Sequence, residues 1–596
     1  MNLRTLNDVF FTVMQRDSDR VMLTRKSGAW KPISARQLRS WVYATARQLR
    51  SWGIGKGDRV ILLSENRPEW AVTDFACLLL GAIDVPIYAT QTAEQCLFVL
   101  QNSEARIAFV STRKQYEKIA AVREQSGIEY VVIMDEAPEI AEAVPMQSFL
   151  GNAPAEDDAE FDDVGRTIEP DDLATLIYTS GTTGTPKGVM LTHGNMAANI
   201  NVSLDMYDMD KNDLCVSFLP LSHVTARHLD YALFNAGVPV AYCPVIEELP
   251  QAMREVHPTV IVAVPRVYEK VYNQVQNKAH GIKRALIQWA LNVGAANRET
   301  ILRGETPASL SWKLADALVF SKIREGLGGR ARIFVSGGAP LGKEIATWYA
   351  DVGIRIHEGY GLTETSPVVA LNNPINHRLG TVGKAMPNLE VRIAEDGELL
   401  VRGPSVFKGY WKMPEETAAV FEDDWFKTGD IVSIDEDGYL SILDRKKDLI
   451  KTSGGKFIAP QPIESSLKVN QFISEAALLG DMRRFPAVLI IPSFEDLENW
   501  ARHHGMKFSS RKELVRSHQV HSLYQGIVEE MNQNLAQFEK LKKVLVVHEE
   551  LSIAEGTLTP SMKLRRRNLT ERYKREIDAL YAEAEAHSRT TASAKR

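Results

Sequence analysis

Cysteine is scarce in this chain, and its spacing argues against two classes of protein. The 596 residues include four cysteines, Cys77, Cys96, Cys215 and Cys243. They lie far apart and form no CxxC pair, so they fit neither a disulfide framework nor a structural zinc site. We therefore expect a protein of a reducing compartment, the cytoplasm.

Long apolar runs and a large excess of either charge are also missing. The first twenty residues carry scattered charges and no apolar core, unlike a secretory signal. The most apolar window, residues 75–89, is interrupted by Asp84 and Pro86 and is too short to span a bilayer as a helix. The net charge of -6 gives no reason to expect a nucleic acid partner, and the length predicts more than one domain.

Glycine and hydroxyl side chains are concentrated in residues 178–195, YTSGTTGTPKGVMLTHGN. The glycines free the backbone and Lys187 adds a cation, so we expect this loop to bind a polyphosphate. Residues 173–178 predict a buried strand and the stretch after His193 predicts a helix, so the loop should lie at a strand-to-helix junction, where amides attract an anion. A P-loop does not fit, because proline and glycine flank the lysine. The alternative is a mobile surface loop with a solvated lysine.

Around this loop the apolar pattern alternates between short strands and helices. Ser34 is a good N-cap for an amphipathic helix that ends at Gly53. Further elements are expected as strands at residues 60–63, 85–88, 107–110 and 130–134, and as helices from Pro68 and over residues 94–102. This alternation predicts parallel sheets covered by helices. The acidic residues 156–163 should form a solvated loop.

The pattern changes to short alternating strands after about residue 390. Residues 431–434 and 439–443 flank the turn DEDG, which predicts a hairpin in an antiparallel sheet. The terminal segment has an α/β pattern of its own, and its last ten residues should be frayed.

Two apolar rows at helical spacing lie between residues 270 and 330, and we expect both to face the core of their own domain. They are Leu286, Trp289, Ala290 and Val293, and then Leu310, Leu314 and Leu318.

Four further motifs present groups that suit a nucleotide. SGGAP, residues 336–340, places two glycines at a strand end, where a flat ring can approach the backbone. HEGYGLTETSP, residues 357–367, offers a ring, a hydroxyl and a carboxylate for stacking, phosphate contact and magnesium. TGD, residues 428–430, adds a carboxylate, and LTPSMKLRRR, residues 558–567, adds a lysine among arginines. Taken singly, each is also explained as a turn or as solvated surface charge.

Together and in this order, the motifs closely resemble those of the adenylate-forming superfamily, which includes acyl-CoA synthetases, luciferases and adenylation domains of peptide synthetases. The strings His-Val-x-x-Arg and Thr-Pro-x-x-Lys are similar to the long-chain fatty acid–CoA ligase branch. The resemblance implies an α/β fold. A large N-terminal domain, residues 1–445, would hold helix-covered, mainly parallel sheets and a small β subdomain. A smaller, mobile α+β C-terminal domain, residues 446–596, would act as a lid.

The resemblance also implies roles for individual residues. Lys563, Glu364 and Thr182 would be catalytic, and the last two would hold Mg²⁺. Lys447 would be the hinge between the domains. The residues implied to bind ATP are Thr179, Ser180, Gly181, Thr182, Thr183, Gly184, Lys187, Gly337, Gly338, Ala339, Glu358, Gly359, Tyr360, Gly361, Thr363, Asp430, Arg445 and Lys451.

The acyl pocket would be bordered by His223 and Arg227, although two positions depart from the family pattern. Ala226 stands where the long-chain branch often has glutamate, and Met562 stands where most members have glycine. The departure at Ala226 leaves the local charge pairing and the exact acyl substrate open, whereas Met562 lies in the string Thr-Pro-x-x-Lys, which is similar to the long-chain branch.

The implied reaction has two steps. A carboxylate attacks the α-phosphorus of ATP to give an acyl-adenylate and pyrophosphate, and the thiol of coenzyme A then attacks the activated carbonyl. Cations and positioned donors would bring the two anions together in the first step. The small domain would rotate between the steps. The expected small molecules are a fatty acid, ATP, Mg²⁺ and coenzyme A.

Three functions stay open at this point. The first is a medium-to-long-chain fatty acyl-CoA ligase, the second an acyl-AMP ligase that transfers to a carrier protein, and the third a silent nucleotide-binding scaffold. The presence of every implied site residue argues against the third. Peripheral association with the inner face of the membrane is a further expectation, because the substrate is insoluble and a similar helical region in the family walls the fatty acid tunnel or faces the membrane. The oligomeric state is open.

Overall fold

Two large sheets form the N-terminal domain in the computed structural model, which describes residues 2–150, 159–180, 185–277, 281–453, 456–552, 555–559 and 564–593. The first sheet has the strand order β19-β9-β8-β4-β3-β5-β6-β7. Strands β8 to β7 run parallel, and β9 and β19 extend the sheet antiparallel at one edge. Its strands are β3 (Arg59–Leu63), β4 (Ile83–Ile87), β5 (Ile107–Val110), β6 (Tyr130–Ile133), β7 (Val144–Pro145), β8 (Leu173–Ser180), β9 (Pro186–Thr192) and β19 (Gly409–Tyr410).

The second sheet has the order β16-β15-β14-β13-β12-β10-β11-β1-β2. Strands β14 to β1 run parallel, and β2, β15 and β16 add antiparallel edges. Its strands are β1 (Met22–Lys26), β2 (Ala29–Ile33), β10 (Cys215–Ser217), β11 (Val240–Tyr242), β12 (Val260–Ala263), β13 (Ile333–Ser336), β14 (Ile356–Gly361), β15 (Val368–Leu371) and β16 (Lys384–Ala385).

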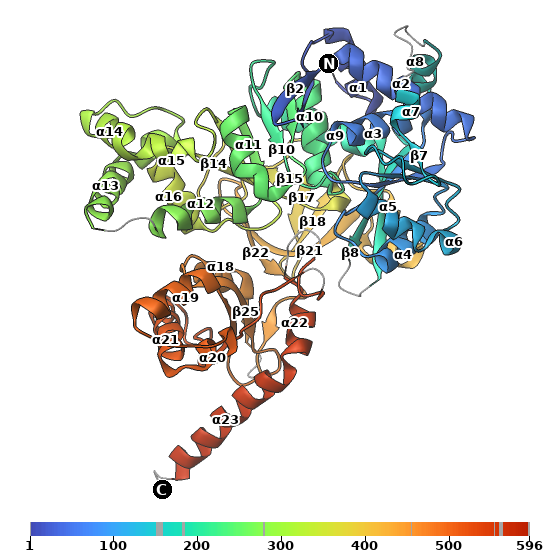
Figure 1. Cartoon of the computed structure of the whole chain (residues 1–596). Helices are drawn as coiled ribbons and strands as arrows, with labels where there is room; N and C mark the ends of the chain where they lie inside the picture. The colour runs from blue at the N-terminus through green and yellow to red at the C-terminus, as the bar shows by residue number, and fades with distance from the viewer. Residues whose placement is uncertain are drawn as a thin grey trace.

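One hydrophobic core joins the two sheets, because it combines buried residues of β3, β5, β9, β10 and β11 with several helices. Because the two sheets share this core, the carboxyl ends of their strands are held in fixed positions relative to each other. These strand ends carry the site described below (Figure 1). The helices of this domain are α1 (Asn7–Arg16), α2 (Ala35–Ser51), α3 (Pro68–Leu80), α4 (Ala93–Ser103), α5 (Arg113–Ala120), α6 (Arg123–Ser126), α7 (Gln147–Leu150), α8 (Ala159–Arg166), α9 (His193–Asp205), α10 (Val224–Ala236), α11 (Leu249–Val256), α12 (Pro265–Asn277), α13 (Ile282–Leu302), α14 (Leu310–Ala315), α15 (Ser321–Glu325) and α16 (Lys343–Asp351).

A smaller antiparallel sheet follows, which we call the β subdomain. Its strand order is β17-β18-β21-β20, and β22 is paired to β21. It confirms the expected change to antiparallel structure and the β21–β22 hairpin. The elements are β17 (Glu390–Ile393), β18 (Glu398–Arg402), α17 (Pro414–Ala419), β20 (Phe421–Glu422), β21 (Trp425–Ile434) and β22 (Leu440–Arg445).

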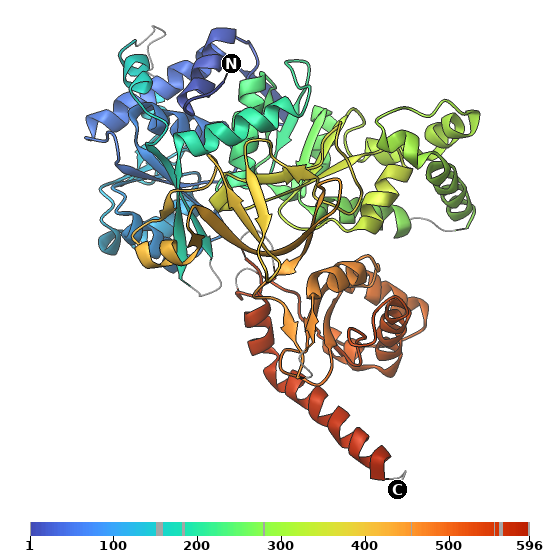
Figure 2. The same cartoon turned by 180° about the vertical axis from the view of Figure 1, so that it is seen from behind.

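The C-terminal domain has a separate core, whose buried residues extend from Ile450 to Tyr581. Figures 1 and 2 show it in orange and red beside the larger domain, with the C-terminal end of α23 projecting away from the rest of the molecule. Figure 2 shows the same arrangement from behind. Its elements are β23 (Ile450–Lys451), β24 (Phe457–Ile458), α18 (Pro460–Lys468), β25 (Ile473–Leu479), β26 (Ala487–Pro492), α19 (Phe494–His503), α20 (Arg511–Arg516), α21 (His518–Asn532), β27 (Val544–Val546), α22 (Arg566–Arg572) and α23 (Lys574–Ser593).

Local sequence signals explain where several elements begin and end. The Ser34 side chain accepts a hydrogen bond from Gln37 N, so it satisfies one of the exposed amides at the start of α2. Pro68 is in the first turn of α3, where its missing N–H costs nothing. Gly81 ends the same helix in the left-handed conformation. The predicted helix starts and the parallel strands between residues 59 and 133 are confirmed.

Two segments predicted to lack structure are helical. Part of the acidic stretch 156–163 lies in α8, because Phe161 is fully buried and stacks on the ring of Tyr43. Residues 151–158 are outside the described residues. Of the last ten residues, which were expected to fray, residues 587–593 continue the backbone of α23, and residues 594–596 are outside the described residues.

The two apolar rows have different environments. Ala290 of α13 is buried, and its row packs against a hydrophobic core as expected. The side chains of Leu310, Leu314 and Leu318 are 84%, 53% and 40% exposed, so the core prediction is wrong for this row. The opposite face of the same segment, which includes Trp312, already fills the core. Within the described ranges, the helices are too short or too polar to cross a membrane.

Candidate active site

The glycine-rich loop connects two antiparallel strands. β8 and β9 pair along their length, up to the pair of Ser180 with Pro186, and α9 begins after β9, at His193. The predicted strand-to-helix junction is therefore wrong, and the loop is the end of a hairpin. The error arises because residues 186–192, which belong to the glycine-rich stretch, form β9, and four of these seven residues are buried.

The flanks of this hairpin contribute to a cavity. Thr179 and Lys187 face each other across the β8–β9 pair, and both line the cavity. The Lys187 ammonium lies 4.8 Å from the centroid of the Tyr410 ring. Ser180 is placed at the end of β8, but its side chain lies outside the described part of the structure. The other predicted loop residues fall outside the described residues and are Gly181, Thr182, Thr183 and Gly184.

The second sheet contributes the carboxyl ends of β13 and β14. These strands are parallel, and Ser336 is paired with Glu358. The segment after β13 turns sharply at Gly338, whose φ of +81° favours glycine. Gly337 and Gly338 line the cavity with Ala339, which leaves a wall with little side-chain bulk.

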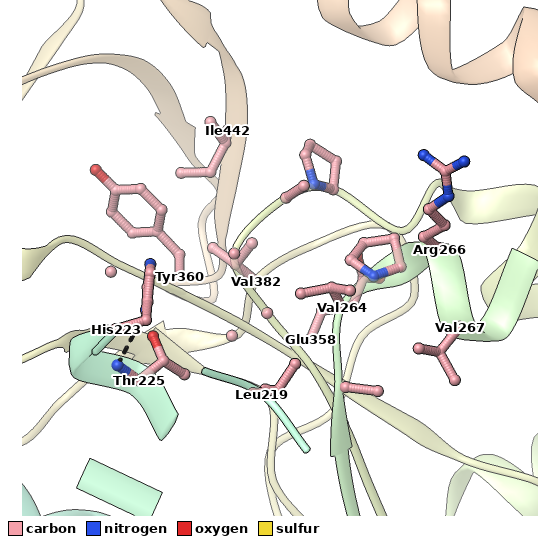
Figure 3. Close-up of a pocket in the computed structure, with 18 of the residues that line it drawn as sticks. Leu219, His223, Thr225, Val264, Arg266, Val267, Glu358, Tyr360, Val382 and Ile442 are labelled. Atoms are coloured by element: carbon pink, nitrogen blue, oxygen red, sulfur yellow. Dashed lines mark hydrogen bonds between the residues drawn. The ribbon is translucent and has the colours of Figure 1, made fainter. Parts of the chain in front are cut away.

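Glu358 is a buried carboxyl group on this wall. It is 8% exposed, and its Oε2 accepts a hydrogen bond of 3.3 Å from Leu341 N. Burial raises the pKa of Glu358 to about 7, because the ionised form loses contact with water. A carboxyl group that changes charge near neutral pH therefore lies at the edge of the cavity (Figure 3).

Tyr360, at the end of β14, connects the second sheet to the β subdomain. Its hydroxyl donates to Asp430 Oδ2 at 2.5 Å, and Arg445 Nε donates to Asp430 Oδ1 at 2.9 Å. Asp430 is 2% exposed and lies opposite Arg445 in the β21–β22 pair. Burial is the main cause that raises the pKa of Tyr360, and the negative charge of Asp430 is the second, so the Tyr360 hydroxyl remains a donor. All three side chains line the cavity.

The two glycines beside Tyr360 are required by close packing. A Cβ atom at Gly361 would lie 1.9 Å from the carbonyl oxygen of Pro367, and one at Gly359 would lie 2.9 Å from Leu371 Cδ1. Gly361 therefore lets two backbone segments approach each other, and Gly359 leaves room for the Leu371 side chain.

Thr363 and Glu364 follow on a short 3-10 turn, η3 (Thr363–Thr365), and both line the cavity. The Glu364 Oε1 atom accepts a hydrogen bond of 2.9 Å from the Tyr410 hydroxyl. Tyr410 in turn lies under Lys187, so the carboxylate and the ammonium are connected through one ring.

The cavity has a volume of about 3640 Å³ and is lined by both sheets, the β subdomain and the C-terminal domain. Sites for single small ligands are commonly about 300–1,000 Å³, so the space suits more than one substrate. Figure 3 shows Glu358 and Tyr360 with Leu219, Val264 and Val382 around the same space.

His223 lies on the side of the cavity that is mainly apolar. It is the N-cap of α10, and its Nδ1 accepts a hydrogen bond of 3.2 Å from Thr225 N (Figure 3). Further apolar lining comes from Phe218, which directly follows β10, and from residues of α10 and β12 that include Leu229 and Val262. An alkyl chain would therefore find apolar contacts on this side.

Arg227 is placed away from the cavity. Its side chain is 1% exposed and lies 2.5 Å from Asp74 Oδ1 and 2.9 Å from Asp84 Oδ2. Tyr231 completes this cluster, since its hydroxyl accepts from Arg227 Nε and donates to Asp74. The structure therefore brings His223 to the cavity but directs Arg227 into a buried ionic cluster that ties α10 to α3 and β4.

The segment between the domains contains the predicted hinge. Lys447 lines the cavity, and burial, with a contribution from Arg445, lowers its pKa. The preceding Asp444 accepts hydrogen bonds from Gln461 N and from Arg445 N, at 2.9 and 2.7 Å. Burial raises the pKa of Asp444 to about 6.

Of the two other predicted lysines, one lies away from the cavity and the other lies outside the described residues. Lys451 is exposed on β23, with its ammonium 5.3 Å from the centroid of the Phe457 ring. Lys563 falls outside the described residues, between Thr559 and Leu564.

Sequence reasoning did not identify Tyr410, although the structure places it between Lys187 and Glu364. Its neighbours FKGYW carry a weak signal, since a glycine next to aromatic residues fits a short edge strand. Its position depends on pairing with β9, more than 200 residues earlier in the chain.

Comparison with known proteins identifies the class. Residues 10–411 match the AMP-binding enzyme family, and residues 447–585 match the AMP-binding enzyme C-terminal domain. The chain therefore belongs to the AMP-binding, adenylate-forming enzymes. This confirms the resemblance and the fold class, a large α/β domain with a β subdomain and a C-terminal domain. The family is one of AMP-forming acid–thiol ligases that bind ATP.

Individual relatives cover nearly the whole chain. It is 38% identical over 574 residues to the long-chain-fatty-acid–CoA ligase FadD15 of Mycobacterium tuberculosis, and the alignment covers 95% of each chain. It is 31% identical over 622 residues to the long-chain-fatty-acid–CoA ligase ACSBG1 of Homo sapiens, covering 97% of this chain and 85% of that protein.

Solved structures have the same fold. ATP-bound MatB from Rhodopseudomonas palustris is 25% identical and superposes with a TM-score of 0.70, covering 96% of this chain and 99% of that chain. The anthranilate CoA ligase AuaEII in complex with anthranoyl-AMP is 18% identical, with a TM-score of 0.73 and 98% of both chains covered.

Proposed function

We propose that this chain is a long-chain fatty acid–CoA ligase, which activates the acid as an acyl-adenylate and then transfers it to coenzyme A. The observation that carries the proposal is the meeting of Lys187, Glu364, Tyr360 and Asp430 around one cavity whose far side, beyond His223, is apolar. The relatives that are 31% and 38% identical and are named long-chain fatty acid–CoA ligases support the substrate class.

In the first step, the nucleotide would lie along the ends of β13 and β14. The adenine would rest against Tyr360 and the Gly337 to Ala339 segment, and the ribose hydroxyls would donate to Asp430. The phosphates would meet Lys187 and the glycine-rich loop. Because a carboxylate must approach a polyphosphate, these residues would act by neutralising and orienting charge.

Magnesium fits the donors that are present. Glu364 supplies carboxylate oxygen, the kind of ligand that Mg²⁺ prefers, at the cavity wall, and Tyr410 fixes its Oε1 atom. Glu364, with Thr182 as a second oxygen ligand, would hold the ion beside the phosphates. When bound there, the ion supplies positive charge to the phosphate oxygens.

The C-terminal domain would contribute in both steps. Lys563 would supply a positive charge at the α-phosphate during adenylation. The domain, whose boundary we place between Arg445 and Lys446, would then rotate about Lys447 so that the thiol of coenzyme A reaches the carbonyl. Lys451 would belong to the face used in this second step.

The deciding assay uses purified protein with ATP, Mg²⁺, coenzyme A and a series of fatty acids of increasing length. Acyl-CoA together with AMP and pyrophosphate is the expected product, and the series gives the chain-length preference. Accumulation of acyl-adenylate without thioester would instead favour the acyl-AMP ligase that uses a carrier protein. ATP binding without acyl-adenylate or acyl-CoA formation would favour the silent nucleotide-binding scaffold, and absence of ATP binding would contradict all three functions.

Peripheral association with an anionic lipid surface is part of the proposal. The exposed row Leu310, Leu314 and Leu318 supports it, because apolar side chains beside the exposed Lys313 and Lys322 suit the interface of such a membrane.

A further inference from the structure

Tyr410 lies where the glycine-rich hairpin meets the segment that carries Glu364. It forms β19 with Gly409, and this strand pairs antiparallel with β9, opposite Val189 and Met190. β9 is the strand that leaves the glycine-rich loop and carries Lys187. The ring of Tyr410 is 7% exposed, with the Lys187 ammonium 4.8 Å from its centroid.

The same short segment holds Glu364 at two points. The Tyr410 hydroxyl donates to Glu364 Oε1 at 2.9 Å, and the backbone N–H of Phe407 donates to the Glu364 carbonyl oxygen at 2.8 Å. Burial, followed by the nearby Glu364 carboxylate, raises the pKa of Tyr410. The hydroxyl therefore keeps its proton and remains a donor to the carboxylate in the working pH range.

The backbone around Tyr410 leaves the ring little freedom. Tyr410 N donates to Thr417 Oγ1 at 2.9 Å, and Trp411 N donates to the Gly188 carbonyl oxygen at 2.8 Å. The ring of Phe407 packs edge-on at a centroid distance of 4.9 Å. A displacement of the tyrosine hydroxyl would therefore have to disturb the pairing between β19 and β9.

We propose that Tyr410 is a positioning residue that fixes the carboxylate of Glu364 relative to the strand of the phosphate-binding hairpin, and that it strengthens divalent-metal binding through Glu364. The inference rests on the proposed function, in which Glu364 holds Mg²⁺. The physical reason is orientation: a donor that occupies one carboxylate oxygen limits rotation of the group and directs the other oxygen to the metal.

The test measures metal binding directly, with Mn²⁺ as the probe. Free Mn²⁺ is followed by electron paramagnetic resonance as the full-length protein with bound ATP is titrated, and ATP binding in EDTA is measured separately. Tyr410→Phe keeps the ring and its contact with Lys187 but removes the hydroxyl. Tyr43→Phe is the matched control, since the Tyr43 hydroxyl donates to the Asp162 carboxylate at 2.5 Å in α8.

Tyr410→Phe should weaken Mn²⁺ binding by about tenfold, the effect expected when an outer partner of a metal ligand is lost, and should leave ATP binding in EDTA unchanged. Tyr43→Phe should change neither. In a Glu364→Gln background, Tyr410→Phe should have no further effect, because its influence passes through that carboxylate. Additive losses in the double variant would contradict this.

Other results distinguish the inference from the proposed function. If the unmodified protein binds no Mn²⁺ with ATP, the proposed function fails and the inference with it. If it binds Mn²⁺ but Tyr410→Phe binds equally well, only the inference is overturned. Should Tyr410→Phe not fold, Thr417→Ala, which removes the acceptor of the Tyr410 backbone amide, should weaken Mn²⁺ binding in the same direction, and unchanged binding would overturn the inference.

Discussion

Glu358 should make ATP binding depend on pH, because it places a carboxyl group with a pKa of about 7 beside the proposed adenine position. The exocyclic amine of adenine is a donor, and an ionised carboxylate accepts from it better than the protonated form. The complex therefore favours loss of the proton. Affinity should rise as the pH increases through 7 and level off above it.

The size of the effect follows from the fraction ionised. With a pKa of about 7, the free protein would hold Glu358 about 91% ionised at pH 8 and about 9% ionised at pH 6, which predicts a roughly tenfold loss of affinity at pH 6. Glu358→Gln keeps the size and an acceptor oxygen but cannot titrate. At each pH, the dissociation constant of the Glu358→Gln variant is divided by that of the unmodified protein. The protonation of ATP itself affects both values equally and so cancels in this ratio.

Isothermal titration calorimetry at pH 6, 7 and 8 measures this ratio. Glu344→Gln is the control, because Glu344 also lines the cavity but is exposed on α16. The affinity advantage of the unmodified protein over Glu358→Gln should be greatest at pH 8 and small at pH 6. A ratio that stays constant with pH would refute the role of the ionised carboxylate.

Three further results are expected. Lys563→Ala should abolish acyl-dependent pyrophosphate exchange while sparing thioesterification of supplied acyl-adenylate, and loss of both with an intact fold would contradict this division. Gly361→Ala should lower the free energy of unfolding by about 1–3 kcal/mol in denaturant titrations, because its Cβ would meet the Pro367 carbonyl oxygen at 1.9 Å. Gly526→Ala is the control, because a Cβ at this position of α21 would meet no atom within 4 Å, and a Gly361→Ala variant as stable as the unmodified protein would refute the steric argument. Sedimentation with anionic vesicles should fall, without a loss of stability, when serine replaces the exposed Leu310, Leu314 and Leu318; unchanged sedimentation would count against this surface.

The sequence predicts those elements whose signal is local. Ser34 and Pro68 mark helix starts through the chemistry of their own turn, and the apolar runs at residues 60–63 and 107–110 are short enough to be strands. The parallel sheet then follows from the alternation with helices. None of these inferences needs a partner that is distant in the chain.

The sequence-based predictions fail where a residue that is distant in the chain determines the environment of a side chain. Leu310, Leu314 and Leu318 define one face of a helical segment, but the periodicity cannot say whether another element covers that face. Arg227 stands four residues after His223, yet its guanidinium is held by Asp74, which is 153 positions away. An ionic partner in the core thus holds Arg227 away from the acyl pocket that the family resemblance implied for it.

In the candidate site, the sequence likewise identifies individual residues but not the hydrogen bonds that join them. Two motifs indicate the residues: HEGYGLTETSP contains Tyr360 and Glu364, and TGD contains Asp430. Their arrangement depends on bonds between units, from β14 to β21 through the Tyr360 hydroxyl and from η3 to β19 through Tyr410. Since each link joins segments that fold in different sheets, the site is complete only when the sheets are docked. A substitution that weakens this docking should therefore reduce nucleotide and metal binding together, even when it touches neither ligand.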